Sequence, residues 1–144
     1  MIEQDTIRLL RECDAGVKMG VSSIDEVMPH VQSQELAKRL AQTKEQHEKL
    51  QMEITGLLGR YQDEGKAPNP IAKGMSWLKT NVKLGLDDSD ATVADLMTDG
   101  CNMGVKSLCK YLNEYEAADE ISKDIAKRLI QQEQQLSNQM QKFL

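Results

Sequence analysis

The chain has 144 residues and a net charge of −5, with 40% hydrophobic, 28% charged and 3% aromatic residues. One domain of this length can bury a real core, and the shortage of aromatics favours a core of Leu, Ile, Val, Met and Ala, which suits helix packing. Acidic and basic residues are interleaved, which argues against a nucleic-acid surface, and no apolar run is long enough to span a bilayer.

The three cysteines include no Cys-x-x-Cys pair, and the first residues lack the basic and apolar regions of a signal peptide. An odd number of cysteines fits a reducing compartment better than a disulfide framework. We therefore expect a cytoplasmic protein.

The first predicted helix covers about residues 5–27, with Asp5 as its N-cap and Pro29 beyond its end. Gly16 and Gly20 lower its helix propensity, so we expect a neighbouring helix to approach closely there. Its apolar stripe, at spacings of three and four, consists of Ile7, Leu10, Cys13, Val17, Val21 and Ile24.

The second predicted helix is longer, over about residues 33–64, with Ser33 as its N-cap and Gly65 as its stop. His47 falls within its apolar stripe and, if buried, needs a hydrogen-bond partner, for which Thr43, Gln132 or a water is expected. The stripe consists of Leu36, Leu40, Thr43, His47, Leu50, Ile54 and either Leu58 or Tyr61.

A connector follows, with a short amphipathic helix predicted over about residues 70–84 and closed by Gly85. It carries three lysines and Trp77, so contact with a membrane surface is an alternative. At this length we expect it to pack on its own bundle instead. The polar stretch Asp87–Asp90 caps the next helix.

Two more helices are predicted over about residues 90–115 and 119–142, separated by a short turn at Ala117 and Ala118. The apolar stripe of the first is Ala94, Met97, Cys101, Gly104, Leu108 and either Leu112 or Tyr111. The stripe of the second is Ile121, Ile125, Leu129, Gln132, Leu136, Met140 and Phe143.

Two short stretches occur twice at nearly the same separation. Residues 13–18, CDAGVK, return 88 residues later as CNMGVK over 101–106, and LAKRL over 36–40 returns 89 residues later as IAKRL over 125–129. This pattern predicts a duplicated helical hairpin, with the two antiparallel pairs joined by a long crossover.

Two equivalent hairpins, one long crossover and a polar residue in mid-helix resemble the ferritin-like superfamily. The stretches at 13–16 (CDAG), 45–48 (EQHE) and 99–101 (DGC) are similar to an uncharacterised bacterial branch described only as a domain of unknown function. The resemblance covers nearly the whole chain. It implies an all-α, ferritin-like four-helix bundle that forms a single domain over residues 1–144.

Classical ferritin-like proteins bind two irons through a Glu from each of two helices and a Glu-x-x-His from each of the other two. The resemblance implies that at most three of these six ligand positions are filled here, by Asp14, His47 and Glu133. Lys44 replaces one carboxylate and Leu136 replaces one histidine. A standard di-iron site, and the ferroxidase, oxygenase or iron-storage activity that needs it, is therefore not expected.

Cys13 and Cys101 are related by the repeat and lie where the first and third helices would carry carboxylates. We expect that they face each other near the middle of the bundle. Three roles remain open for them: small buried hydrophobes, a redox pair that acts as a thiol switch, or thiolate ligands beside His47. The first is favoured because buried free cysteines usually behave as hydrophobes.

Two functions follow from this reading. The first is a structural, interaction or stress-associated protein without a catalytic residue or cofactor. It is expected to form a homodimer, because Met19, Met52 and Leu57 lie outside the main stripes and need cover. The second is a redox protein that depends on iron, manganese or zinc. Its unusual core site would be built from Asp14, His47, Glu133, Cys13 and Cys101.

Overall fold

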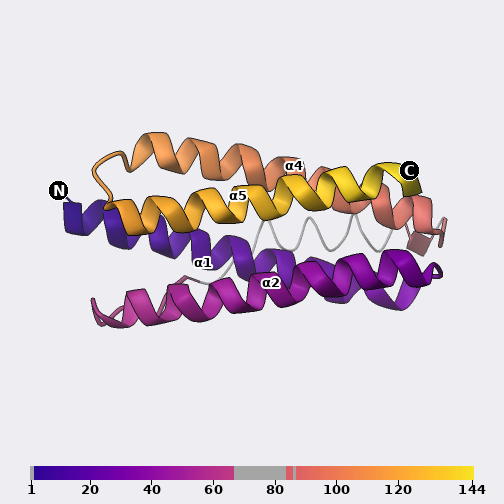
Figure 1. The fold of residues 1–144 in the computed structure, drawn as a ribbon, viewed down its shortest axis with the longest axis horizontal. Helices are drawn as coiled ribbons and strands as arrows, with labels where there is room; N and C mark the ends of the chain where they lie inside the picture. The colour runs from indigo at the N-terminus through magenta and orange to yellow at the C-terminus, as the bar shows by residue number, and fades with distance from the viewer. Residues whose placement is uncertain (1, 67–83, 86) are drawn as a thin grey trace.

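The computed structural model describes residues 2–66, 84, 85 and 87–144 (Figure 1). All regular structure in these residues is helical, which confirms the prediction of an all-helical bundle. The elements are α1 (Ile2–Val27), η1 (Met28–His30), α2 (Gln34–Gly59), α4 (Asp90–Glu114), α5 (Glu120–Met140) and η2 (Gln141–Phe143). The helix predicted over 70–84 lies outside the described residues, except for its last residue, Leu84.

The four long helices lie side by side along a common axis (Figure 1). The closest packing is within the pairs α1–α2 and α4–α5, which we call the first and second hairpins. Helix α5 also contacts α1 and α2, and α1 also contacts α4. Thus α1 and α5 are central, while α2 and α4 lie on opposite sides, at the bottom and top of Figure 1.

The helices α2 and α4 run in the same direction. In Figure 1, α2 ends at the end of the bundle that holds the N-terminus, whereas α4 begins at the opposite end, beside the C-terminus. Each hairpin is antiparallel within itself. A short connection would instead have made α2 and α4 antiparallel neighbours.

Side-chain caps fix the beginnings of three helices, as the sequence predicts for two of them. Ser33 Oγ accepts the Leu36 amide at 3.2 Å, Ser89 Oγ accepts the Thr92 amide at 3.2 Å, and Asp119 Oδ1 accepts the Ser122 amide at 2.8 Å. These caps pair backbone N–H groups that have no partner within the helix.

Two predicted helix ends were wrong. Helix α1 begins at Ile2, so Asp5 lies within its first turn and accepts the Ala117 amide at 3.1 Å instead of capping α1. Helix α2 ends at Gly59, before the predicted residue 64, because Gln62 has a left-handed φ of 57°. The Asp63 amide then bonds back to the Leu58 carbonyl at 3.1 Å, which closes the helix.

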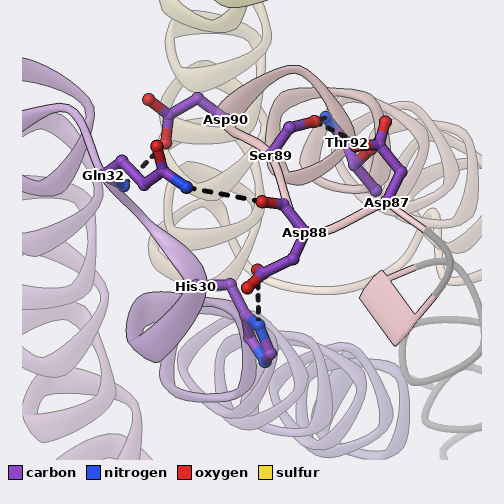
Figure 2. A network of polar contacts seen from close by, with 7 residues as sticks. All are labelled: His30, Gln32, Asp87, Asp88, Ser89, Asp90 and Thr92. Carbon is purple, nitrogen blue, oxygen red and sulfur yellow. Dashed lines mark hydrogen bonds and ion pairs between the residues drawn. The ribbon is translucent and has the colours of Figure 1, made fainter.

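The loop between α1 and α2 is bound to the start of α4 (Figure 2). The amides of Gln32 and Ser33 donate to the Asp90 carboxylate at 2.8 and 3.0 Å, and His30 Nδ1 lies 2.8 Å from Asp88 Oδ1. His30 is partly exposed and paired with Asp88. This junction holds the two hairpins together at one end of the bundle.

The core is divided along the bundle axis into two hydrophobic clusters, each with residues from all four helices. Cluster 1 consists of Leu9, Leu10, Cys13, Val17, Leu50, Ile54, Leu58, Leu108, Ala118, Ile125, Ala126 and Leu129. Cluster 2 consists of Ile24, Val27, Leu36, Leu40, Leu84, Val93, Ala94, Met97, Cys101, Leu136 and Met140. Ile121 was predicted in the core but is 55% exposed, and the neighbouring Ser122 is buried in its place.

Candidate functional site

A layer of small and polar residues separates the two clusters. We call it the mid-bundle layer, and its members are Gly20 of α1, His47 of α2, Gly104 of α4 and Glu133 of α5. Each member lies between the last residue of one cluster and the first residue of the other on its helix. The layer contains a buried imidazole and a buried carboxylate and is therefore the candidate site.

His47 and Glu133 form a buried pair across the layer. His47 Nε2 lies 2.8 Å from Glu133 Oε1, and the two residues are 1% and 9% exposed. His47 Nδ1 is buried without a partner among the described residues. An unpaired acceptor is tolerated better than an unpaired N–H donor. We therefore assign the imidazole proton to Nε2, from which it is donated to the Glu133 carboxylate.

Both glycines lie against this pair, and Gly20 gives the imidazole its space. A Cβ atom on Gly20 would lie 2.8 Å from His47 Cδ2 and 2.9 Å from Nε2, which is closer than real side chains approach. A Cβ on Gly104 would lie 3.6 Å from Glu133 Oε2, an ordinary contact. The close approach predicted at Gly16 and Gly20 is found at Gly20, where the approaching group is the His47 side chain. It is not found at Gly16, where an added Cβ would lie 3.6 Å from Leu129 Cδ2, an ordinary contact.

Neither of the two side chains predicted as partners of His47 is bonded to it. Thr43 donates its hydroxyl to the Arg39 carbonyl of its own helix at 3.2 Å, and Gln132 Oε1 has no partner among the described residues. The α5 residue that points into the bundle at this level is Glu133, whereas the predicted apolar stripe placed Gln132 there. A spacing of four after Leu129 would have selected Glu133, as the internal repeat did.

Cys101 lies beside the layer and next to Glu133. Burial raises the pKa of the Cys101 thiol, and the Glu133 carboxylate raises it further. A thiol in this setting stays protonated at neutral pH, and the protonated form is a poor nucleophile and a poor metal ligand.

Cys13 lies away from Cys101, on the other side of the layer. Cys13 belongs to cluster 1 and Cys101 to cluster 2, so the expectation that they face each other was wrong. Burial, with smaller contributions from Glu12 and Asp14, raises the pKa of the Cys13 thiol to about 12. Cys109 is exposed. The positions of the two buried thiols favour the role of small hydrophobes.

Asp14 has a different function from the one implied by the resemblance. It is 2% exposed, and its carboxylate accepts from Lys18 Nζ at 2.6 Å, Gln51 Nε2 at 3.2 Å and the Lys66 amide at 3.0 Å. Gly65 packs directly on this carboxylate with a φ of 92°, a conformation that favours glycine. Asp14 therefore fastens the segment after α2 to α1.

The residues present do not fit a di-iron site. Such a site needs carboxylates from all four helices, and at the level of His47 and Glu133 the helices α1 and α4 provide glycines. Of the five predicted metal ligands, only His47, Glu133 and Cys101 lie together. Over residues 2–66, 84, 85 and 87–144, no group of three or more His, Cys, Asp or Glu side chains is arranged to hold a metal ion.

A shallow groove of about 400 Å³ lies on the surface between α1 and α2. It carries charges of both signs and is open to solvent, and it contains none of the predicted ligands. Its lining residues are Lys18, Val21, Ser22, Asp25, Glu26 and Gln51.

Comparisons with known proteins returned no match to a family model, a curated protein or a solved structure. Among the helices described, none combines the length and apolar character needed to cross a membrane.

Proposed function

We propose that the chain is a ferritin-like bundle in which a hydrogen-bonded polar layer has replaced the metal site. It acts as a structural, interaction or stress-associated protein in the cytoplasm and has no catalytic activity. The observation that carries the proposal is the His47–Glu133 pair at 2.8 Å, enclosed by Gly20 and Gly104 at mid-bundle.

The burial of the repeated residues supports a duplicated origin. Cys13 of α1 and Cys101 of α4, which are separated by 88 positions, are both buried. The second repeat also has matching burial, since Leu36 and Leu40 are fully buried and so are their counterparts, Ile125 and Leu129.

The chemistry of the layer supports a role without catalysis. A catalytic site needs a nucleophile, an acid–base group or a bound cofactor that substrate can reach. His47 is 1% exposed, Cys101 is 1% exposed, and Glu133 is engaged by the imidazole. These groups can hold helices together, but they present no reactive atom to solvent.

A homodimer remains part of the proposal. Met52 is 75% exposed, and Met103 is 69% exposed on the helix of the other hairpin. Exposed methionines of this kind gain from burial in an interface with another protein or a second copy of the chain.

The alternative is a redox protein that depends on iron, manganese or zinc. One observation favours it: the buried His47 Nδ1, which has no partner among the described residues and is chemically suited to a metal. Asp14 and Cys13 do not belong to the layer, so such a site would have fewer protein donors than the sequence suggested.

Metal analysis of protein purified without chelator separates the two functions. We expect less than about a tenth of an equivalent of iron, manganese or zinc per chain, and no change in His47→Ala. The matched control is His30→Ala, which removes the partly exposed histidine. A stoichiometric metal that is lost in His47→Ala and retained in His30→Ala would reject the proposal in favour of the alternative.

A further inference from the structure

The mid-bundle layer joins the two hairpins through a buried polar contact. His47 belongs to the first hairpin and Glu133 to the second, and their side chains are 1% and 12% exposed. Because water has almost no access to either group, the partner in the other hairpin is what satisfies it. The pairing of the hairpins and the hydrogen bonding of these two groups are therefore linked.

The apolar surfaces of the hairpins distinguish poorly between partners. Leu36 and Leu40 of α2 are fully buried, as are Ile125 and Leu129 in the corresponding stretch of α5. Apolar burial is non-directional. On that basis alone, a hairpin would associate with the same hairpin of a second chain as readily as with its neighbour in its own chain.

The polar layer removes this ambiguity. An association of two first hairpins would bury two His47 side chains without a carboxylate, and an association of two second hairpins would bury two Glu133 carboxylates without an imidazole. Burying a charged or polar group without its partner is strongly unfavourable. We propose that the His47–Glu133 pair selects the association of a first hairpin with a second hairpin over the association of like hairpins.

Exposed contacts between the hairpins select less strongly because water can replace the lost partner. The best example is the ion pair of Arg128 with Glu53, a two-point contact at 2.9 and 3.0 Å between α5 and α2. Its side chains are 39% and 51% exposed. It joins the same two helices as the buried pair and therefore provides a matched control.

The inference goes beyond the proposed function, because it concerns how hairpins choose partners and holds with or without an ancestral metal site. It is tested with two full-length variants, His47→Glu and Glu133→His. Alone, His47→Glu places two carboxylates in the layer, and Glu133→His places two imidazoles there. When the two are unfolded and refolded together, exchange of hairpins between chains restores an imidazole–carboxylate pair in both halves of a 1:1 heterodimer.

Native mass spectrometry with one variant isotopically labelled measures the heterodimer, and circular dichroism measures its melting temperature. We expect the heterodimer to be about tenfold enriched over the control mixture, which corresponds to 1.4 kcal/mol. We also expect it to melt at a higher temperature than either variant alone. If one variant does not fold alone, recovery of its helical signal on co-refolding supports the inference equally.

The control mixture contains Glu53→Arg and Arg128→Glu, which exchange the exposed pair between two chains. This mixture also detects heterodimers that form through the outer surfaces of the chains, because their formation does not depend on the mid-bundle layer. Equal heterodimer yields from the two mixtures, or no rise in melting temperature in the buried-pair mixture, would overturn the inference.

Discussion

Gly20 of α1 faces the imidazole of His47 so closely that a methyl group on the glycine would lie 2.8 Å from Cδ2. The buried pair therefore requires a residue without a side chain at position 20, even though glycine has a low helix propensity. A glycine-to-alanine substitution should therefore destabilise the protein at position 20 and stabilise it at an exposed position where the added methyl group meets no neighbour.

Gly20→Ala is expected to destabilise the protein by about 1–3 kcal/mol, because overpacking at His47 outweighs the gain in helix propensity. Gly56→Ala is the control. Among the described residues, no atom outside its own helix lies within 4 Å of an added Cβ there, so it should stabilise α2 by about 0.5–1 kcal/mol. Urea unfolding measures both. Equal effects of the same sign would show that Gly20 does not confine the imidazole.

His47→Leu is expected to destabilise the protein by about 3–5 kcal/mol, because it leaves the Glu133 carboxylate buried without its donor. Adding Glu133→Leu to that variant should recover most of the loss, since two apolar side chains need no partner. A double-mutant cycle by denaturant unfolding gives the coupling energy. Additive effects of the two substitutions would contradict the pairing.

Asp14→Ala is expected to release the segment after α2 from α1. The Lys66 amide donates to Asp14 Oδ2, so its hydrogen exchange should accelerate by about tenfold or more as the local structure opens. Asp124→Ala removes an exposed carboxylate on α5 and should leave the Lys66 amide unchanged. Unaltered exchange at Lys66 in Asp14→Ala would show that other contacts hold this segment.

The three thiols are expected to react at very different rates with iodoacetamide. Cys109 is exposed and should be labelled first, whereas Cys13 and Cys101 should be labelled only on unfolding. With a pKa of about 12, Cys13 is about one part in ten thousand thiolate at pH 8. Peptide mass spectrometry measures the extent of labelling at each cysteine over time. A Cys13–Cys101 disulfide after mild oxidation would contradict the placement of these residues in separate clusters.

Alkaline pH should destabilise the protein through the two buried thiols, whose pKa values are raised by burial. The pKa of Cys13 is raised by folding from its ordinary value of 9.0 to about 12, so the unfolded state loses its proton first. The stabilising contribution is complete below pH 9 and is lost as the pH rises from 9 to about 12. Cys13→Ala should flatten the fall in melting temperature over that range. An identical slope for the variant would assign the alkaline loss to other groups.

The fold was predictable from the sequence wherever a single local pattern of residues determines the structure. The spacing of apolar residues gave all four long helices, and Ser33 and the 87–90 stretch marked two helix starts to within a residue. The end of α2 was missed because it depends on a left-handed residue, Gln62, which carries no glycine signal. The start of α1 was missed because Asp5, a good N-cap type, is used by the α4–α5 turn.

The candidate site was only partly predictable because its members come from four helices. His47 and Glu133 were identified, but their contact depends on how α2 and α5 are rotated against each other, which one sequence does not specify. Asp14 was misassigned because a buried carboxylate can serve a backbone amide as well as a metal, and its partner, Lys66, is distant in sequence. The place of Gly20 in the site follows only from its contact with His47.

The division of the core also has a consequence for biosynthesis. Helix α5 contributes Ile125 and Leu129 to cluster 1, and Leu136 and Met140 to cluster 2. It is synthesised after the other three long helices, so both halves of the core wait for the same segment. Until it arrives, the three earlier helices expose apolar surface along their full length, and a chain that stalls before residue 120 is a substrate for chaperones and proteases.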